Sequence, residues 1–260
     1  MKPITIGFIG GGRITRIFLH GFQNKQIDFK SIKVYDHNSE TLEALKNDFP
    51  DIERTETPSE AAKSEVIVIA VHPPLVMEVL DEIAGTVNEK TYLVSLAPKI
   101  TIARIQEKIK IANIVRMIPN ATSYINKGFN PAAFHDAMLR KEKKFIKKLF
   151  KPLGKLIETE EYKLEGYAVI SGMLPTYFWF QWQELENIAQ KTGLSPEEAK
   201  KAIRSTIKRA VDLYFKSGLT SAEVMDLIPV KPLSEDEEEI RNTLNDRLLG
   251  LYDKIKPAGQ

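Results

Sequence analysis

A glycine turn directly after an apolar strand constrains this 260-residue chain more than any other feature. Residues 4–9 read as a short strand, and Gly10, Gly11 and Gly12 follow at once. Gly10 permits a sharp turn, and Gly12 lacks the Cβ atom that would block the approach of a phosphate. The first amides of the next helix would then face an anion, which the helix dipole favours. This order of strand, glycine turn and helix predicts a dinucleotide-binding Rossmann domain.

An acidic residue is expected about twenty residues later, at the end of a second strand, and Asp36 closes the run of residues 31–36. Its carboxylate would accept hydrogen bonds from the adenosine ribose and repel a 2′-phosphate, which favours NAD(H). NADP(H) remains the alternative cofactor because Asn38 and Ser39 would accommodate its 2′-phosphate. For Asp36 itself, the alternative role is to cap the next helix. Thr15 occupies the third position of the glycine pattern, which is usually Gly or Ala. Because threonine is larger, the close packing of the helix on the strand at this position is less certain to form as in the pattern.

Strand and helix signals alternate in the first part of the chain. We expect strands at residues 5–9, 31–35, 65–71, 91–95, 113–117 and 155–158. After residue 160 the strand signals stop, and capping residues predict helix starts at Ser195, Thr220 and Ser234. The fold class is therefore α/β, with a doubly wound parallel sheet of Rossmann type in a domain of residues 1–158. An all-helical domain is expected over residues 159–260.

Composition narrows the classes of function. The formal net charge of +2 gives no general reason to expect nucleic acid or an anionic membrane as partner. The absence of cysteine excludes disulfides and thiolate chemistry, and the four histidines lie too far apart to predict a metal site. A basic run at residues 140–151 has apolar residues at helical spacing, so it is interpreted as a surface helix with a solvated face.

The longest apolar stretch, residues 167–182, contains glycine and proline and is too short to span a membrane. We interpret it as a buried helix. The first strand begins within three residues and leaves no room for a signal peptide, so a cytoplasmic protein is expected.

Further motifs follow the glycine turn in the order of a known enzyme family. Ala-Val-His-Pro at residues 70–73, Arg-Met-Ile-Pro-Asn at residues 116–120, and Ala-Val-Ile-Ser-Gly at residues 168–172 with Pro175 and Tyr177 carry the likeness. Together with the opening glycine motif they resemble the pyrroline-5-carboxylate reductase family over nearly the whole chain. The resemblance implies NAD(P)H-dependent reduction of a small imine or carbonyl substrate, as in proline biosynthesis.

The segments that resemble the family's substrate site depart from its pattern. Its Ser-Pro-Gly-Gly-Thr-Thr loop, which holds the substrate, corresponds to residues 226–233, which contain no glycine pair and no threonine. Pro229 and Pro232 lack amide donors, so a nest of amides around a carboxylate cannot form in the same way. We therefore expect little or no reduction of pyrroline-5-carboxylate.

Candidate site residues follow from the glycine turn, the end of the second strand and the family motifs. The expected cofactor-binding residues are Gly10, Gly11, Gly12, Arg13, Ile14, Asp36, His37, Asn38, Ala70, Val71, His72, Pro73 and Asn120. The catalytic candidates are Asn120, Ser171, Thr176 and Tyr177. Asn120 follows the carboxyl end of a strand, where such sheets bind ligands, although a plain turn is its alternative role. Tyr177 is a candidate proton donor, with helix core as the alternative.

Two other classes of function would have the same nucleotide-binding domain. One is a cofactor-binding relative without reductase turnover, and the other is an NAD(P) oxidoreductase linked to a deazaflavin. A homodimer through the helical domain is expected. Its basis is an aromatic cluster, Phe178, Trp179, Phe180 and Trp182, that a small domain alone does not cover.

Overall fold

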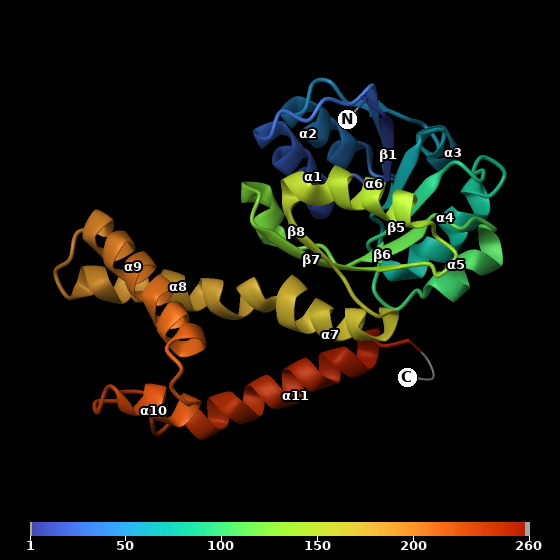
Figure 1. Ribbon diagram of the computed structural model, residues 1–260. Helices are drawn as coiled ribbons and strands as arrows, with labels where there is room; N and C mark the ends of the chain where they lie inside the picture. Colours follow the sequence, from blue (N-terminus) through green and yellow to red (C-terminus); the bar gives the residue numbers. More distant parts are fainter. Residues whose placement is uncertain (1, 258–260) are drawn as a thin grey trace. The chain divides into compact units, whose positions relative to one another are not determined.

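The computed structural model describes residues 2–257 and contains one eight-stranded sheet (Figure 1). Its order is β3-β2-β1-β4-β5-β6-β7-β8. The strands are β1 (Thr5–Ile9), β2 (Ser31–Tyr35), β3 (Glu53–Arg54), β4 (Val66–Ile69), β5 (Tyr92–Ser95), β6 (Ile114–Met117), β7 (Gly128–Phe134) and β8 (Gly154–Glu158). All neighbouring pairs are parallel except β6 with β7. The order reverses between β1 and β4, which creates the switch point where ligands bind in such sheets.

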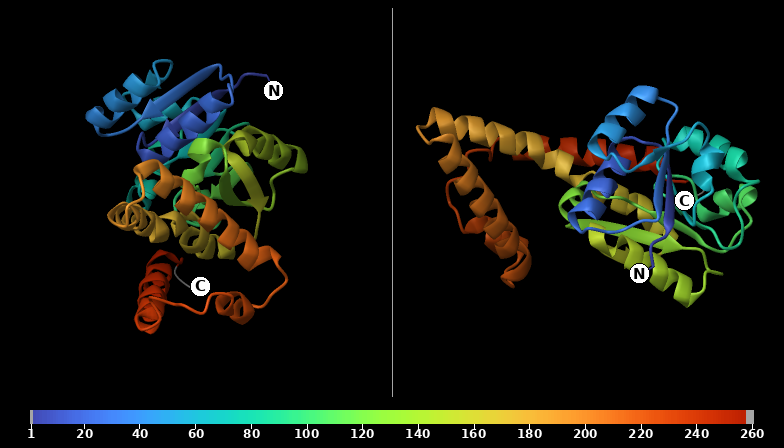
Figure 2. Two further views of the ribbon diagram at one scale, coloured as in Figure 1. Left: turned by 90° about the vertical axis from the view of Figure 1, so that its left-hand side faces the viewer. Right: turned by 90° about the horizontal axis from the view of Figure 1, so that it is seen from above.

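Helices cover both faces of this sheet (Figure 2). They are α1 (Arg13–Asn24), α2 (Ser39–Asp48), α3 (Pro58–Ala62), α4 (Val76–Ile83), α5 (Ile102–Lys108), α6 (Arg140–Phe150) and α7 (Leu164–Tyr167), and a π-helical turn (Ala168–Gly172) follows α7. A hydrophobic core lies on each face of the sheet, and the side chains of β4 alternate between them. Val66 and Val68 belong to the core with α1, α2 and α6, whereas Ile67 and Ile69 belong to the core with α3, α4, α5 and α7. The predicted doubly wound α/β fold is confirmed.

The sheet differs from the sequence prediction in two strands. β3 is only two residues long, and β7 contains Pro131, a residue that argues against a strand inside a sheet. Pro131 has no amide donor, but its carbonyl accepts a hydrogen bond from the Ile118 amide at 2.9 Å. β7 also runs antiparallel to β6, so the sheet is mixed rather than wholly parallel.

The chain forms two compact units. One contains the sheet and runs to Met173, together with residues 251–257; the other spans Leu174–Gly250. The division falls after Met173, later than residue 158, because Leu164 and Ala168 bury their side chains in the core of the sheet. The domain boundary at residue 158 remains a sequence-based prediction.

The second unit contains α8 (Leu174–Lys191), α9 (Pro196–Lys216), α10 (Ser221–Asp226) and most of α11 (Glu237–Ile255). Ser195 and Thr220 cap α9 and α10 with complete capping boxes, as predicted. The expected helix start at Ser234 is wrong, because its amide donates to the Lys231 carbonyl in a turn and α11 begins at Glu237.

The interpretation of residues 167–182 as a buried helix is also wrong for α8. Among the described residues of the second unit only Ala199 is buried: α8 packs against α9, but its large apolar side chains Phe178, Trp179 and Phe180 stay exposed. None of the helices within residues 2–257 has the length and apolar composition needed to cross a membrane.

Candidate functional site

The glycine turn lies at the carboxyl end of β1, beside the switch point of the sheet. Gly10 has φ +106°, and a Cβ atom there would lie 2.6 Å from the Ala70 carbonyl oxygen, so only glycine fits. A Cβ atom on Gly12 would meet no described atom within 4 Å, which leaves open space where a phosphate would approach. Thr15 is buried, and its Oγ1 donates to the Gly10 carbonyl at 2.6 Å. The third motif position therefore ties the turn to α1.

Asp36 joins the end of β2 to this turn. Its Oδ2 accepts a hydrogen bond from the Gly11 amide at 2.7 Å, and its Oδ1 accepts from the Asn38 amide at 2.9 Å. Asn38 caps α2 by accepting from the Thr41 amide at 3.0 Å, so the alternative of Asp36 as helix cap is wrong. The Asp36 carboxylate is oriented by backbone donors and keeps lone pairs for ribose hydroxyls.

The other cofactor candidates lie on the same unit. Arg13 and Ile14 open α1, and Ala70 leaves β4 with its amide donating to the Ile9 carbonyl at 2.7 Å. His72 and Pro73 begin a short 3₁₀ turn (Pro73–Leu75). These residues surround the glycine turn at the carboxyl edge of β1 and β4, the edge at which Rossmann sheets bind a dinucleotide.

Two cavities meet at Asp36 and His37. The first, of about 220 Å³, has Val71 and Leu75 in its wall. The second, of about 330 Å³, includes Arg54, whose guanidinium pairs with a carboxylate of α2. Both lie where the adenosine half of a dinucleotide would extend from the glycine turn.

Asn120 and Ser171 are brought together at the end of β6. The Asn120 Nδ2 donates to the Ser171 carbonyl at 2.7 Å, and its Oδ1 accepts from the Thr122 amide at 2.9 Å. The Ser171 Oγ donates to the Tyr167 carbonyl at 2.8 Å. The Asn120 side chain thus caps a 3₁₀ turn (Ala121–Ile125) and also holds the π-helical turn, an element often found at functional sites.

Thr176 and Tyr177 lie on α8 in the second compact unit, so they are described apart from the other candidates. Burial raises the pKa of the Tyr177 hydroxyl above its ordinary value. The hydroxyl is protonated at neutral pH, as in an ordinary tyrosine, and the raised pKa makes it a weaker acid.

A buried ion pair beside the site was not predicted from the sequence. Arg116, 1% exposed, donates to Glu165 Oε1 at 2.6 Å and to Glu161 Oε1 at 2.9 Å. Glu165 Oε1 also accepts from the Lys99 amide at 3.0 Å, and Glu161 Oε1 accepts from the Ile102 amide at 2.7 Å. The pair therefore fastens the loop after β5 to the segment around α7. A charged residue inside an apolar strand was the sequence signal for it.

The sheet and the glycine turn are those of a Rossmann-type dinucleotide-binding domain, and the similarity to known proteins identifies an NAD(P)-dependent oxidoreductase. Comparison with known proteins agrees: the family model described as NADP oxidoreductase, coenzyme F420-dependent, matches residues 5–99. The pyrroline-5-carboxylate reductase of Corynebacterium melassecola is 25% identical over 224 residues, which cover 85% of this chain and 83% of that protein. The pyrroline-5-carboxylate reductase 2 of Bacillus subtilis is 26% identical over 218 residues, covering 82% and 77%. The chain is thus similar to pyrroline-5-carboxylate reductases over 82–85% of its length.

A solved structure shares the whole fold. The crystal structure of Plasmodium falciparum pyrroline carboxylate reductase with NADP bound matches with a TM-score of 0.81 and 23% identity, covering 98% of each chain. The similarity extends over both the sheet-containing part and the helical part of the chain.

Proposed function

We propose that this protein transfers hydride between a nicotinamide cofactor and a small imine or carbonyl compound, with NAD(H) preferred over NADP(H). The observation that carries the cofactor preference is the Asp36 carboxylate, held by the Gly11 and Asn38 amides beside the glycine turn. An oriented carboxylate at this position accepts hydrogen bonds from a free ribose and repels a 2′-phosphate.

The chain's own residues bind and orient the reactants. The turn from Gly10 to Gly12 and the start of α1 would hold the diphosphate, with Arg13 nearby as a positive charge. When bound, the cofactor supplies the hydride. Asn120 would act as a positioning residue, since its side chain holds the backbone of Ser171 beside the end of β6. The hydroxyls of Thr176 and Tyr177 remain the candidates for substrate contact and proton donation.

Pyrroline-5-carboxylate is the substrate in the names of the relatives, but this chain differs from the family pattern in the substrate loop. Residues 226–233 contain Pro229 and Pro232, which donate no amide hydrogen bonds. The apolar side chains of Ile228 and Val230 in this loop are exposed. We infer a substrate that relies less on an amide nest for its carboxylate, and we expect pyrroline-5-carboxylate to be a poor substrate.

The test is a titration of the full-length protein with NADH and NADPH, followed by turnover assays against a panel of cyclic imines, pyrroline-5-carboxylate included. We expect tighter binding of NADH and turnover of at least one imine. Efficient reduction of pyrroline-5-carboxylate would overturn the substrate inference, and tighter binding of NADPH would overturn the cofactor preference. Binding without turnover of any imine would favour a cofactor-binding relative.

A deazaflavin-linked NADP oxidoreductase is the second candidate. The family model that matches residues 5–99 is described as coenzyme F420-dependent, and this stretch contains the glycine turn and Asp36. The same assay with a reduced deazaflavin as hydride donor to NADP distinguishes the two, because an imine reductase would show no turnover with that donor.

We also propose a homodimer through the helical unit. Phe178, Trp179 and Phe180 are exposed on α8, and Phe215 is exposed on α9. Exposed apolar patches of this kind mark protein interfaces. A second copy of the chain would cover them.

A further inference from the structure

A lysine in the loop after β5 has a strained backbone. Lys99 has φ +71°, in the left-handed region that residues other than glycine rarely adopt. Within residues 2–257 only Gln26 and Asn126 share this feature, and asparagine tolerates the region better than other residues do. Strain of this kind persists only where the surrounding contacts hold it, and it gathers at functional sites.

Buried charges hold the loop of Lys99 in this conformation. Glu165, 0% exposed, accepts the Lys99 amide at 3.0 Å on the same oxygen that pairs with Arg116 at 2.6 Å. Glu161 accepts the Ile102 amide at 2.7 Å, three residues further along the loop. Burial of such charges is costly, and both contacts with the loop are made to its amides. The ion pair therefore fixes the backbone of the loop, while the Lys99 side chain stays available.

This inference rests on the proposed function, which places the nicotinamide near Lys99. Asp36 follows β2 and the glycine turn follows β1, so the nicotinamide half extends the other way, across β4 and β5. β5 lies two strands from β1, a separation of about 10 Å. Ser95 of β5 pairs with Arg116 of β6, and Lys99 and Asn120 each follow four residues later. Both therefore leave the sheet at the same level of its carboxyl edge.

The Lys99 ammonium is a cation without a partner in the described part of the chain. Its side chain is exposed and forms no ion pair within residues 2–257, whereas Lys108 on the following helix pairs with Asp81 at 2.7 Å. Lysine binds an anion as a point charge and does not need the fixed geometry of an amide nest. Such a charge suits a substrate site whose loop at residues 226–233 contains two prolines without amide donors.

We propose that Lys99 determines substrate specificity by binding a carboxylate on the substrate, so that the substrate class is a cyclic imine that carries a carboxylate. The fixed backbone at Lys99 reduces the freedom that the side chain loses when the carboxylate binds. Glu165 and Arg116 act through Lys99 as positioning residues, because they hold the loop and do not themselves contact the substrate.

The test compares two imines with the same ring, 1-pyrroline-2-carboxylate and 1-pyrroline, in steady-state assays of the full-length protein with NADH. We expect the wild type to prefer the carboxylate. Lys99→Met should raise the KM for 1-pyrroline-2-carboxylate about tenfold with little change in kcat, because it removes one charged hydrogen bond formed on binding. The kinetics with 1-pyrroline should not change.

Two further variants separate the side chain from the backbone. Lys99→Gly relieves the strain at φ +71° and should still lose the preference, because the ammonium is gone. Lys99→Arg retains a positive charge and should keep most of it. Lys110→Met is the matched control, since Lys110 is exposed and lies before β6, at the opposite edge of the sheet, and it should behave as the wild type.

Titration with NADH separates the failure of this inference from that of the proposed function. Equal efficiency of the wild type with both imines, or an unchanged KM in Lys99→Met and Lys99→Gly, would overturn the inference and leave the proposed function standing. A matching loss of NADH affinity in Lys99→Met would assign the ammonium to the cofactor and also overturn it. NADH binding without turnover of either imine would overturn both.

Discussion

At the scale of single residues, the site depends on polar side chains whose partners are distant in sequence. Asp36 binds the Gly11 amide, Asn120 binds the Ser171 carbonyl, and Arg116 binds Glu165. The first two contacts join segments that follow different strands, and the third joins strand β6 to α7. These contacts hold the carboxyl edge of the sheet in one arrangement, and such fixed side chains reduce the entropy that binding costs.

Replacement of Asp36 tests the cofactor preference. In Asp36→Ala the ribose loses its acceptor, the Gly11 amide loses a hydrogen bond, and the charge that opposes a 2′-phosphate is removed. We expect NADH to bind about tenfold more weakly, about 1.4 kcal/mol, while NADPH binding falls less or improves. Asp28→Ala, at an exposed position before β2, should change neither affinity. A variant that keeps the wild-type ratio of the two affinities would contradict this role of Asp36.

Replacement of Arg116 tests the buried ion pair. Arg116→Met leaves the fully buried Glu165 carboxylate without its cation, so the free energy of unfolding should fall by about 3–5 kcal/mol. The double variant Arg116→Met/Glu165→Leu removes both charges and should recover part of this loss, although the Lys99 amide then lacks its acceptor. Urea denaturation at neutral pH measures all three proteins. A single variant within about 1 kcal/mol of the wild type would refute a stabilising role for the pair.

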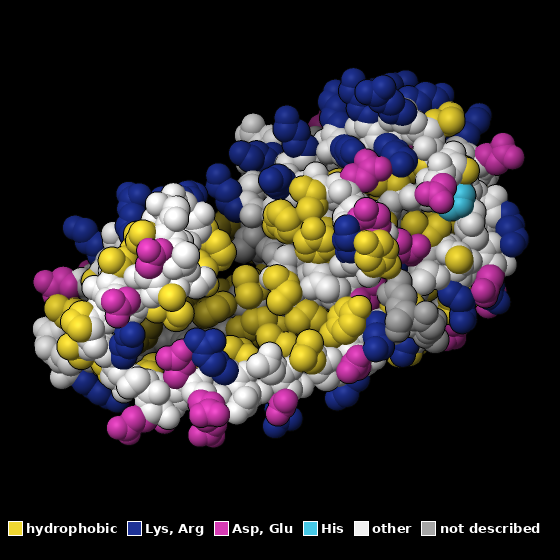
Figure 3. Space-filling view, turned by 60° about the horizontal axis from the view of Figure 1, so that its bottom comes forward, with side chains coloured by type: hydrophobic (Ala, Val, Ile, Leu, Met, Phe, Trp, Pro, Cys, Tyr) yellow, Lys and Arg dark blue, Asp and Glu magenta, His cyan; other side chains and the backbone are white. Residues whose placement is uncertain are grey.

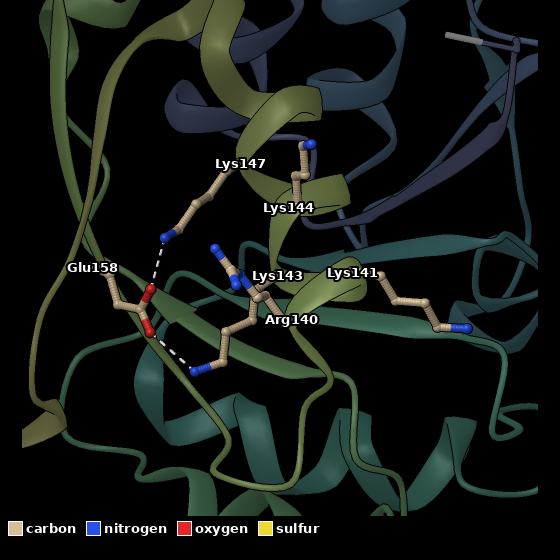
Figure 4. A pocket seen from close by; sticks show the side chains of 6 residues that line it. All are labelled: Arg140, Lys141, Lys143, Lys144, Lys147 and Glu158. Carbon is tan, nitrogen blue, oxygen red and sulfur yellow. Dashed lines mark hydrogen bonds and ion pairs between the residues drawn. The ribbon is translucent and has the colours of Figure 1, made fainter.

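At the scale of elements, α6 illustrates how a basic run serves packing. Ile146, Leu149 and Phe150 are buried against the sheet, as the helical spacing of apolar residues predicted. On the outer side Lys143 and Lys147 both reach Glu158 of β8, at 2.9 and 2.6 Å, whereas Lys141 points away (Figure 4). One carboxylate thus connects the helix to the edge strand.

The Glu158 contact predicts a pH dependence. Hydrogen bonds from Lys147 and Lys143 lower the pKa of Glu158 against the opposing effect of burial. A lowered pKa means that the contribution to stability is complete above the ordinary glutamate pKa of about 4.3 and is lost as pH falls through the folded value. Because the groups are partly exposed, Glu158→Gln should lower the free energy of unfolding by only about 0.5–1 kcal/mol at pH 7. Urea titrations should show a smaller difference near pH 3.5; an equal difference at both pH values would contradict the assignment.

At the scale of the whole molecule, the two compact units differ in how they bury apolar surface. The sheet-containing unit has a core on each face of its sheet. The unit from Leu174 to Gly250 leaves large apolar side chains exposed, and Figure 3 shows hydrophobic side chains gathered at the surface. A helical unit with so little buried apolar area is not expected to be stable by itself. In the proposed homodimer, a second copy of the chain would cover these exposed apolar side chains.

Light scattering tests the homodimer. Phe180 is 65% exposed on α8, and Phe180→Glu would place a charge in the proposed apolar interface. We expect the wild type to have the mass of a dimer at micromolar concentration and the variant to shift toward the monomer with a lower melting temperature. Ile125→Glu is the control, because Ile125 is 61% exposed on the sheet-containing unit. A wild type with the mass of a monomer would overturn the proposal.

Much of the fold was predictable from the sequence because its signals are local. The turn at Gly10, the strand at residues 5–9 and the capping boxes at Ser195 and Thr220 depend on a few neighbours in the chain. β7 was not predictable, because Pro131 argues against a strand and only the hydrogen bond from Ile118 and the neighbouring strands give it a place in the sheet.

The sequence by itself determined the class of fold, the glycine turn and the acidic residue after the second strand, since these patterns need only short-range spacing. The tertiary structure alone decided that Asp36 binds the glycine turn while Asn38 caps α2, and that Arg116 is paired with Glu165. The physical reason is that burial and pairing of charges depend on contacts between segments far apart in the chain, which local spacing does not specify.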